Sequence, residues 1–291
     1  MNEQGGKVFC TDPIALNAWY VVGVVDEIPP GTVLRTRLLD TPLMVARAAD
    51  GGIAAEVAGA EGTNLPVREK FGYVWTTLGD PPAGIFDIPE YDEPDRRNMN
   101  AASFGVRTSA PRVVENFLDM GHFAFVHTDY LGVEPHTQIK AYKTAVSAAG
   151  DEVVATECFA YQPLASIAAS EGFDVEYAYR VPHPYCAILY KSCVLDPTRR
   201  DVIAIFLQPT SEETVIAHMM LSVLDDTNSD LAIRGYQQLI FGQDKPIVEN
   251  QLPKRLPLDM RSELSVRADA SSAAYRRWLS ERGVQYGTIP A

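Results

Sequence analysis

Five short stretches rich in β-branched and aromatic residues follow one another between residues 151 and 224. Clusters of Asp, Gly, Pro or Ser separate them, and these residues favour turns. Several strands at such close spacing predict an antiparallel sheet in this part of the chain. The five stretches are Val153–Tyr161, Phe173–Val181, Ala187–Leu195, Val202–Gln208 and Thr214–Val223.

The first third of the chain also has the composition of strands. Ala18–Val25, Thr32–Ala46 and Lys70–Leu78 are rich in β-branched and aromatic residues, and Pro, Gly and Asp residues interrupt them. This pattern predicts a small β domain. The next segment, 81–97, carries four prolines and many carboxylates, which is typical of an exposed connector.

Three segments show the periodicity of helices. Apolar residues recur at helical spacing within Pro111–His127. Ser229 or Asp230 is placed to cap a long helix, which Pro246 is expected to bend or interrupt. A last amphipathic helix is expected over Ala270–Arg282.

Polar side chains of the first predicted helix form one stripe. Asn116, Asp119 and His122 are each three residues apart, so they share a helix face. His127 follows five residues after His122, an advance of about 500° that places it roughly 140° away on an ideal helix. The two imidazoles therefore meet one metal only if the helix ends or kinks, and Gly121 is the expected weak point.

Two neutral imidazoles and one carboxylate make up the facial triad that holds non-haem Fe(II) and leaves coordination positions open. A lone His122 would more often be a packed helix residue than a ligand, and the H-x4-H spacing alone is weakly specific. Acidic residues are plentiful downstream, where Asp244 and Glu249 compete for the third place.

The cysteines exclude a cluster carried by this chain. There is no Cys-x-His or Cys-x2-His pair, and Cys10, Cys158, Cys186 and Cys193 are scattered. A structural zinc or a [2Fe-2S] centre bound by this chain alone is therefore not expected. Four scattered thiols in such a chain indicate reduced cysteines and a cytoplasmic location.

The formal charge of −13 and the absence of a Lys/Arg run argue against a nucleic-acid partner. No apolar run is long enough to cross a membrane. Residues 1–7 are polar, so no secretory signal is expected.

The order Asn116-x2-Asp119-x2-His122-x4-His127, followed by Gln243-Asp244-Lys245, resembles the catalytic α subunit of Rieske non-haem iron oxygenases. The closest likeness is to the branch of O- and N-demethylases of aromatic compounds. The N-terminal stretches Asn17–Val22 and Leu65–Trp75 also stand in the family's order, so the resemblance covers nearly the whole chain. It implies an α+β fold: a Rieske-like small β domain over residues 1–100, and a helix-grip (START-like) antiparallel sheet domain over residues 101–291 with the iron-site helices packed on it.

The departure from the family is specific. The family's cluster ligands lie between the strand ending near Val57 and the segment starting at Leu65, and here only Ala58–Asn64 fills that interval. The small domain is thus expected to be a truncated remnant without cluster ligands. In this it is similar to a branch that removes the N7 methyl of 7-methylxanthine in bacterial caffeine breakdown, with the Rieske cluster on the reductase.

The resemblance implies a role for each candidate residue. His122, His127 and Asp244 would hold mononuclear Fe(2+), with Glu249 as the fallback for Asp244. Asp119 would be the electron-transfer bridge between an iron-bound histidine and a cluster histidine on a neighbouring subunit. Asn116 would support Asp119 through a hydrogen bond.

The resemblance therefore implies a terminal oxygenase component that hydroxylates an N-methyl or O-methyl group and releases formaldehyde. Electrons would come from NAD(P)H through FMN and iron–sulfur clusters on a partner reductase with a Rieske domain. A further subunit is allowed, and the assembly is expected to be trimer-based or hetero-oligomeric. Two alternatives stay open: an inactive structural or ligand-binding subunit, and, with little support, a zinc hydrolase on the same three ligands.

Overall fold

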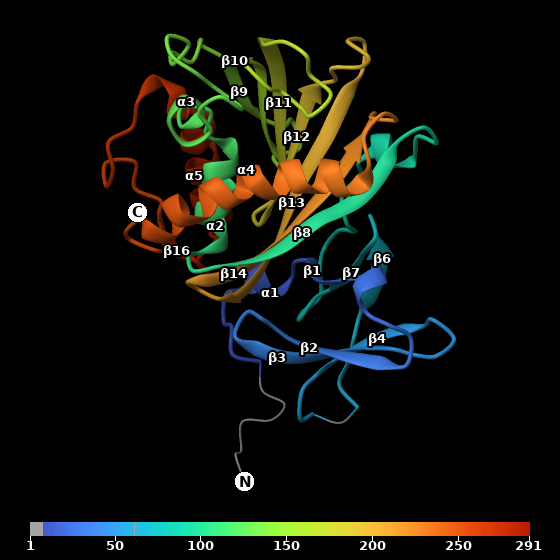
Figure 1. Cartoon of the computed structure of the whole chain (residues 1–291). Coiled ribbons are helices and arrows are strands. Elements are labelled where there is room, and N and C mark those ends of the chain that lie inside the picture. The colour runs from blue at the N-terminus through green and yellow to red at the C-terminus, as the bar shows by residue number, and fades with distance from the viewer. Residues whose placement is uncertain (1–7, 61) are drawn as a thin grey trace.

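The computed structural model describes residues 8–60 and 62–291; the polar segment 1–7, where no secretory signal is expected, lies outside this part. Two layers of strands and one layer of helices make up the molecule (Figure 1). The helices are α1 Pro13–Leu16, α2 Ala110–Leu118, α3 Phe123–Val126, α4 Asp230–Asn250 and α5 Ala270–Arg282, with 3₁₀ turns η1 Val25–Glu27, η2 Pro89–Asp92 and η3 Arg267–Asp269. The strands are β1 Tyr20–Val24, β2 Thr32–Leu38, β3 Thr41–Arg47, β4 Ile53–Val57, β5 Asn64–Leu65, β6 Val67–Lys70, β7 Tyr73–Thr76, β8 Arg97–Val106, β9 Lys143–Val146, β10 Val153–Gln162, β11 Phe173–His183, β12 Cys186–Ser192, β13 Arg200–Ser211, β14 Thr214–Val223, β15 Leu256–Pro257 and β16 Thr288–Ile289.

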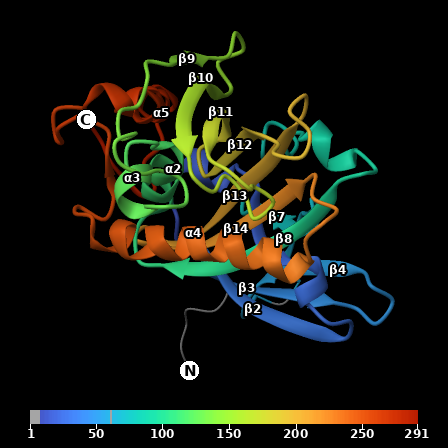
Figure 2. The same cartoon turned by 45° about the horizontal axis from the view of Figure 1, so that its top comes forward.

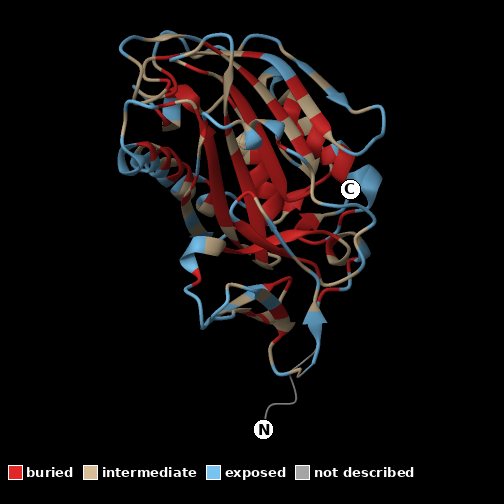
Figure 3. Cartoon of the chain, turned by 90° about the vertical axis from the view of Figure 1, so that its right-hand side faces the viewer, coloured by how far each residue is buried: buried red, intermediate tan, exposed pale blue. Residues whose placement is uncertain are grey.

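A seven-stranded antiparallel sheet forms the centre, with strand order β8-β14-β13-β12-β11-β10-β9. Both of its faces are covered, so the strands β12, β13 and β14 are largely buried on both sides (Figure 3). Strand β12 shows the consequence of the pleat. Its Ile188 and Tyr190 pack toward the N-terminal sheets, whereas Ala187 and Leu189 join the core beneath the helices.

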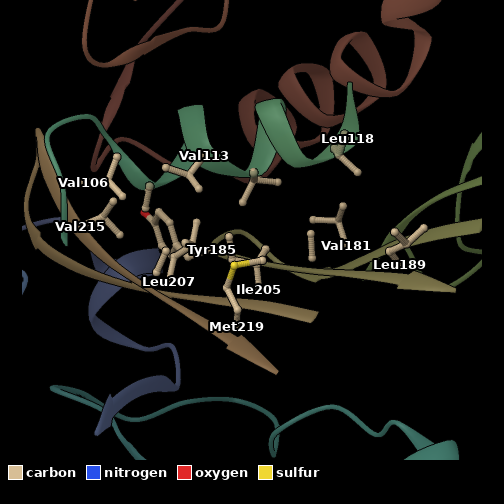
Figure 4. Packing of buried hydrophobic residues seen from close by; sticks show 14 of the residues in the cluster. Val106, Val113, Leu118, Val181, Tyr185, Leu189, Ile205, Leu207, Val215 and Met219 are labelled. Carbon is tan, nitrogen blue, oxygen red and sulfur yellow. The ribbon is translucent and has the colours of Figure 1, made fainter. Parts of the chain in front are cut away.

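Helices cover one face of the sheet. Helix α4 packs on β8, α2 packs on β12 and β13, and α5 packs on β9 and β10. Figures 1 and 2 show α4 lying along the β8 side, with α2, α3 and α5 gathered around one of its ends. Figure 4 shows Val113 and Leu118 of α2 pointing toward the sheet, with Leu118 over Val181 and Leu189. This contact ties the start of the candidate site to the centre of the sheet.

The other face is covered by the N-terminal strands. They form a three-stranded sheet, β1-β7-β6, and a four-stranded sheet, β2-β3-β4-β5. Trp75 and Tyr73 of β7 pack on Phe206 of β13, with ring centroids 5.0 and 5.4 Å apart. Among the described residues of the interval Ala58–Asn64, only Asn64 belongs to a strand, and no Cys or His stands there. No helix among the described residues is long and apolar enough to cross a bilayer.

The α+β fold with a large antiparallel sheet, predicted from the sequence, is confirmed. All five predicted stretches between 151 and 224 are strands, and Ser229 caps α4 by accepting a hydrogen bond from Ala232 N (3.2 Å). One strand was not predicted and one prediction needs correction. Strand β8, Arg97–Val106, begins where the expected connector 81–97 ends, and it forms because its partly buried residues pair with β14. Helix α4 is not interrupted at Pro246 and continues to Asn250.

Candidate metal centre

The break between α2 and α3 creates the site. Helix α2 ends at Leu118, and Asp119 adopts extended backbone angles (φ −82°, ψ 122°). The Asp119 carboxylate accepts the backbone N–H of Gly121 at 2.6 Å, which holds the turn. His122 and His127 then flank the single turn of α3 as its two caps. The expected interruption near Gly121 is present, but the first helix ends before His122 rather than between the two histidines.

Three side-chain atoms converge at this point. His122 Nε2 and His127 Nε2 lie 3.1 Å apart, and Asp244 Oδ1 lies 3.2 Å from the first and 3.1 Å from the second. Octahedral bonds of about 2.1 Å at right angles place neighbouring ligand atoms about 3 Å apart. The spacing of the three atoms therefore fits one face of an octahedron. Asp244 is 8% exposed and His127 1%, so water is largely kept from this triangle.

The outer nitrogens of both imidazoles have acceptors. His122 Nδ1 lies 3.1 Å from Asp119 Oδ2, and His127 Nδ1 lies 2.8 Å from Gln243 Oε1. An N–H on each Nδ1 donates to these oxygens and leaves both Nε2 lone pairs facing Asp244. Two lone pairs and a carboxylate at such distances repel one another unless a cation lies among them. The donor set and its orientation therefore fit a divalent metal.

The pKa values of His122 and Asp244 also indicate that the site favours a positive charge. Burial lowers the pKa of His122, but hydrogen bonds and charges from Asp119 and Asp244 outweigh burial and raise it to about 9. Burial raises the pKa of Asp244, and the hydrogen bonds to both histidines more than reverse this effect and lower it. The pocket thus favours a cation, either a proton or a metal ion.

The structure brings the other two candidate residues to the same place. Asp119 contacts His122, as its expected bridging role requires. The Asn116 side chain contacts Asp244 rather than Asp119: its amide donates to Asp244 Oδ1 at 3.4 Å. The hydrogen bond found between Asn116 and Asp119 is a backbone one, from Asp119 N–H to the Asn116 carbonyl at 3.2 Å. Glu249, the fallback ligand, pairs instead with Lys245 at 2.7 Å and is not part of the triangle.

A cavity of about 120 Å³ adjoins the triangle and runs between α4 and the sheet. From Asp244 to Ile233 it follows about 16 Å of helix. Its walls are mainly apolar and aromatic, with a few polar groups, as is usual for small-molecule sites. Its lining includes Phe123, Tyr177, Leu189, Met219, Phe241 and Asp244.

A second depression lies on the outer side of the same histidine. This outer groove is lined by residues that include Asp119, Ile247, Met260 and Leu264. Leu264 is 95% exposed. His122 lines both the groove and the inner cavity. The Asp119–His122 pair is therefore the wall between the molecular surface and the metal centre.

The sequence left some site residues without a role. Gln243 stands one residue before the predicted ligand Asp244 on a helix, and this position is the sequence signal for its contact with His127. Lys191 was not singled out. The signal there is a lysine in phase with Ala187 and Leu189, at an inward position of a predicted strand.

A mononuclear non-haem metal site of the two-histidine, one-carboxylate kind, carried on a helix-covered antiparallel sheet, defines the class of protein. Residues 106–284 match the family described as "Vanillate O-demethylase oxygenase C-terminal domain". The chain belongs to this family, as a Rieske oxygenase-type catalytic α subunit, and the family implies a mononuclear iron.

Two named relatives agree with this assignment. "Probable methylxanthine N7-demethylase NdmC" from Pseudomonas sp. (strain TJI-51) is 47% identical over 273 residues, which are 94% of this chain and 96% of that protein. "Methylxanthine N1-demethylase NdmA" from Pseudomonas putida is 27% identical over 218 residues, 74% of this chain and 59% of that protein.

Solved structures share the fold. Pseudomonas putida CBB5 NdmA with caffeine superposes with a TM-score of 0.73 at 19% identity, over 91% of each chain. Dicamba monooxygenase bound to dicamba superposes with a TM-score of 0.70 at 18% identity, over 93% of this chain and 99% of that chain.

Proposed function

We propose that this chain is an oxygenase component that removes an N-methyl group from a heteroaromatic compound, with N7-demethylation of 7-methylxanthine as the specific reaction. The single observation that carries this proposal is the triangle of His122, His127 and Asp244 at the end of an aromatic-walled cavity. The 47% identity to a probable methylxanthine N7-demethylase supports the choice of methyl group and substrate class.

His122, His127 and Asp244 would hold Fe(2+), which supplies activation of dioxygen when bound. One oxygen atom enters a C–H bond of the methyl group, and the other leaves as water with two electrons and two protons. The resulting N–CH2OH group loses its C–N bond, which releases formaldehyde and the N–H product. The chain itself would contribute an aromatic-walled cavity that orients the ring and limits access of water.

The electrons would enter through the outer groove. Because the chain has no Cys-x-His or Cys-x2-His pair, the Rieske cluster must be on another chain. We propose a reductase that carries NAD(P)H-reduced FMN and iron–sulfur clusters, one of them in a Rieske domain. This domain would dock in the groove against Asp119, whose carboxylate touches both the surface and His122. Apolar Ile247 and Leu264 offer it a contact surface, and the oligomeric assembly would place further subunits nearby.

Reconstitution tests this proposal. Protein loaded with ferrous iron without air, mixed with a reductase that bears its own Rieske domain, should release formaldehyde from 7-methylxanthine. Asp119→Asn should keep the iron content of the wild type yet lose most of the turnover, because the metal ligands stay in place while the bridge loses its charge. Iron-loaded wild type without turnover of any methylxanthine or methoxybenzoate would refute the enzymatic role. Equal loss of iron and turnover in Asp119→Asn would refute the bridging role.

A further inference from the structure

Two charged side chains face each other in the inner cavity. Lys191 of β12 and Asp201 of β13 are paired across the strands, and Lys191 is also paired with Tyr177 of β11. Directly paired residues in antiparallel strands point to the same face of the sheet. All three line the inner cavity, and here that face is the one covered by α4.

The Lys191 ammonium is short of partners. It is only 5% exposed and has three N–H donors. Among the described residues it makes one hydrogen bond, to the Ala165 carbonyl, and no ion pair, not even with Asp201. Buried charges are normally paired, because an unpaired one costs several kcal/mol. Burial lowers the pKa of Lys191 to about 8, so it is still protonated at pH 7.

Asp201 supplies the acceptor that complements the Lys191 ammonium. One of its carboxylate oxygens accepts the backbone N–H of Leu224 at 2.9 Å, which leaves acceptor capacity on the group. Burial raises the pKa of Asp201, and the charge of Lys191 opposes this increase. The pair thus presents unused donors next to an unused acceptor in the cavity wall, with Lys191 buried and Asp201 half-buried.

A row of aromatic rings leads from the metal centre to this pair. The His122 and Phe123 ring centroids are 5.1 Å apart, and those of Phe123 and Tyr177 are 5.8 Å apart. Lys191 Nζ lies 6.0 Å from the Tyr177 centroid. A flat ligand with its methyl at the triangle would lie along these rings, and its far edge would meet Lys191 and Asp201.

We propose that Lys191 and Asp201 form a specificity pair that recognises a carbonyl and an adjacent N–H on the substrate edge remote from the reacting methyl. The ammonium donates to the carbonyl oxygen, and the carboxylate accepts the N–H. This inference rests on the proposed function and deepens it. In 7-methylxanthine the matching groups are the C2 carbonyl and one of its flanking N–H groups. Methylation of both flanking nitrogens would leave the Asp201 carboxylate without a donor from the ligand.

Calorimetric titration of iron-loaded protein without air or reductase measures this recognition without turnover. The wild type should bind 7-methylxanthine about 10- to 100-fold more tightly than 1,3,7-trimethylxanthine, since a hydrogen bond to a charged group is worth about 1.5–3 kcal/mol. It should favour 7-methylxanthine over 7-methylhypoxanthine by a similar factor or more, because 7-methylhypoxanthine lacks the C2 carbonyl and also the hydrogen on N3. Comparison of the 1,7- and 3,7-dimethyl compounds identifies the recognised N–H as the one whose methylation weakens binding more.

Substitutions test the two members of the pair separately. Lys191→Met should weaken binding of 7-methylxanthine about 10-fold or more and leave 7-methylhypoxanthine nearly unchanged. Asp201→Asn should reduce the preference for 7-methylxanthine over its trimethyl analogue. Lys143→Met, a change of the same charge at a side chain 72% exposed, is the matched control and should bind like the wild type.

If Lys191→Met lowers the affinities for 7-methylxanthine and 7-methylhypoxanthine by the same factor, this lysine only holds the loop at Ala165, and the inference is overturned. Equal binding of 7-methylxanthine and its trimethyl analogue by the wild type would overturn it without any variant. Undiminished formaldehyde release by Lys191→Met would also refute the pair and leave the proposed function intact. The predicted discrimination without turnover would support the pair and refute the proposed function.

Discussion

Replacement of Gln243 by Leu tests how the chain orients its metal ligands. Gln243 Oε1 accepts the His127 Nδ1 hydrogen at 2.8 Å, and His127 is 1% exposed. This bond determines which nitrogen of His127 keeps its lone pair for the metal. The substitution removes the acceptor while keeping a side chain of similar size on helix α4.

The cost follows from the options left to the imidazole. A buried N–H without a partner costs about 1–3 kcal/mol. The ring avoids this cost only if it turns or moves its proton to Nε2, and each change removes a metal ligand. Loss of such an orienting partner lowers metal affinity about 10- to 100-fold, which corresponds to about 1.4–2.8 kcal/mol. The two ranges agree, so we expect a loss of this size with the rest of the fold intact.

Titration of metal-free protein with Co(II), followed by its visible absorption, measures this affinity without oxygen chemistry. Gln237→Leu is the matched control, because Gln237 is a buried amide of the same helix with no hydrogen bond to a ligand. It should bind Co(II) like the wild type. Gln243→Glu keeps an acceptor and should retain the affinity. If Gln243→Leu binds Co(II) within twofold of the wild type, the orienting role of Gln243 is refuted.

Three further outcomes are expected. Gly132→Ala should lower both the stability, by about 1–3 kcal/mol, and the Co(II) affinity. The reason is that its Cβ would come within 2.6 Å of the backbone of α3, which leads into His127. Urea unfolding measures the stability, and the same titration measures the affinity. Arg112→Met should cost about 1–3 kcal/mol in urea unfolding, because Glu263 and buried Glu115 each lose this guanidinium and keep Arg276 as their other partner. The unfolding free energy of the wild type relative to Lys191→Met should rise by about 3 kcal/mol from pH 7 to pH 11, because only the unfolded chain keeps the proton between about 8 and 10.5; a flat difference would contradict the buried charge.

Local patterning was enough to predict the large sheet. Thr214–Val223 and Ala270–Arg282 were predicted with the bounds that the structure shows, because turn residues or caps mark both ends. Strand β8 was missed because its sequence, Arg97–Val106, is rich in Asn, Ser and Ala and has no strong strand signal. Its structure comes from pairing with β14 and cover by α4, which are contacts between distant segments.

The site was predicted less evenly. The ligand residues follow from a motif and its resemblance, and the structure brings all three together. The partner of Asn116 was not predictable from spacing, because three residues on one helix stripe are neighbours only while the helix continues. Here α2 ends at Leu118, so Asp119 turns outward to His122 while Asn116 stays beside Asp244.

The two sides of the His122 ring face different surroundings, which accounts for how this chain would work without a cluster of its own. Its Nδ1 side is turned to Asp119 and the outer groove, and its Nε2 side is turned to the metal triangle and the inner cavity. Under the proposed function, substrate and electrons would therefore approach one centre from opposite sides of a single imidazole. Substrate would fill the inner cavity without blocking the groove, so a cluster on another chain would need access only to the surface side. The N-terminal sheets that hold the interval Ala58–Asn64 lie across the central sheet from the helices, so a shortening of this interval relative to the family would leave the groove unchanged.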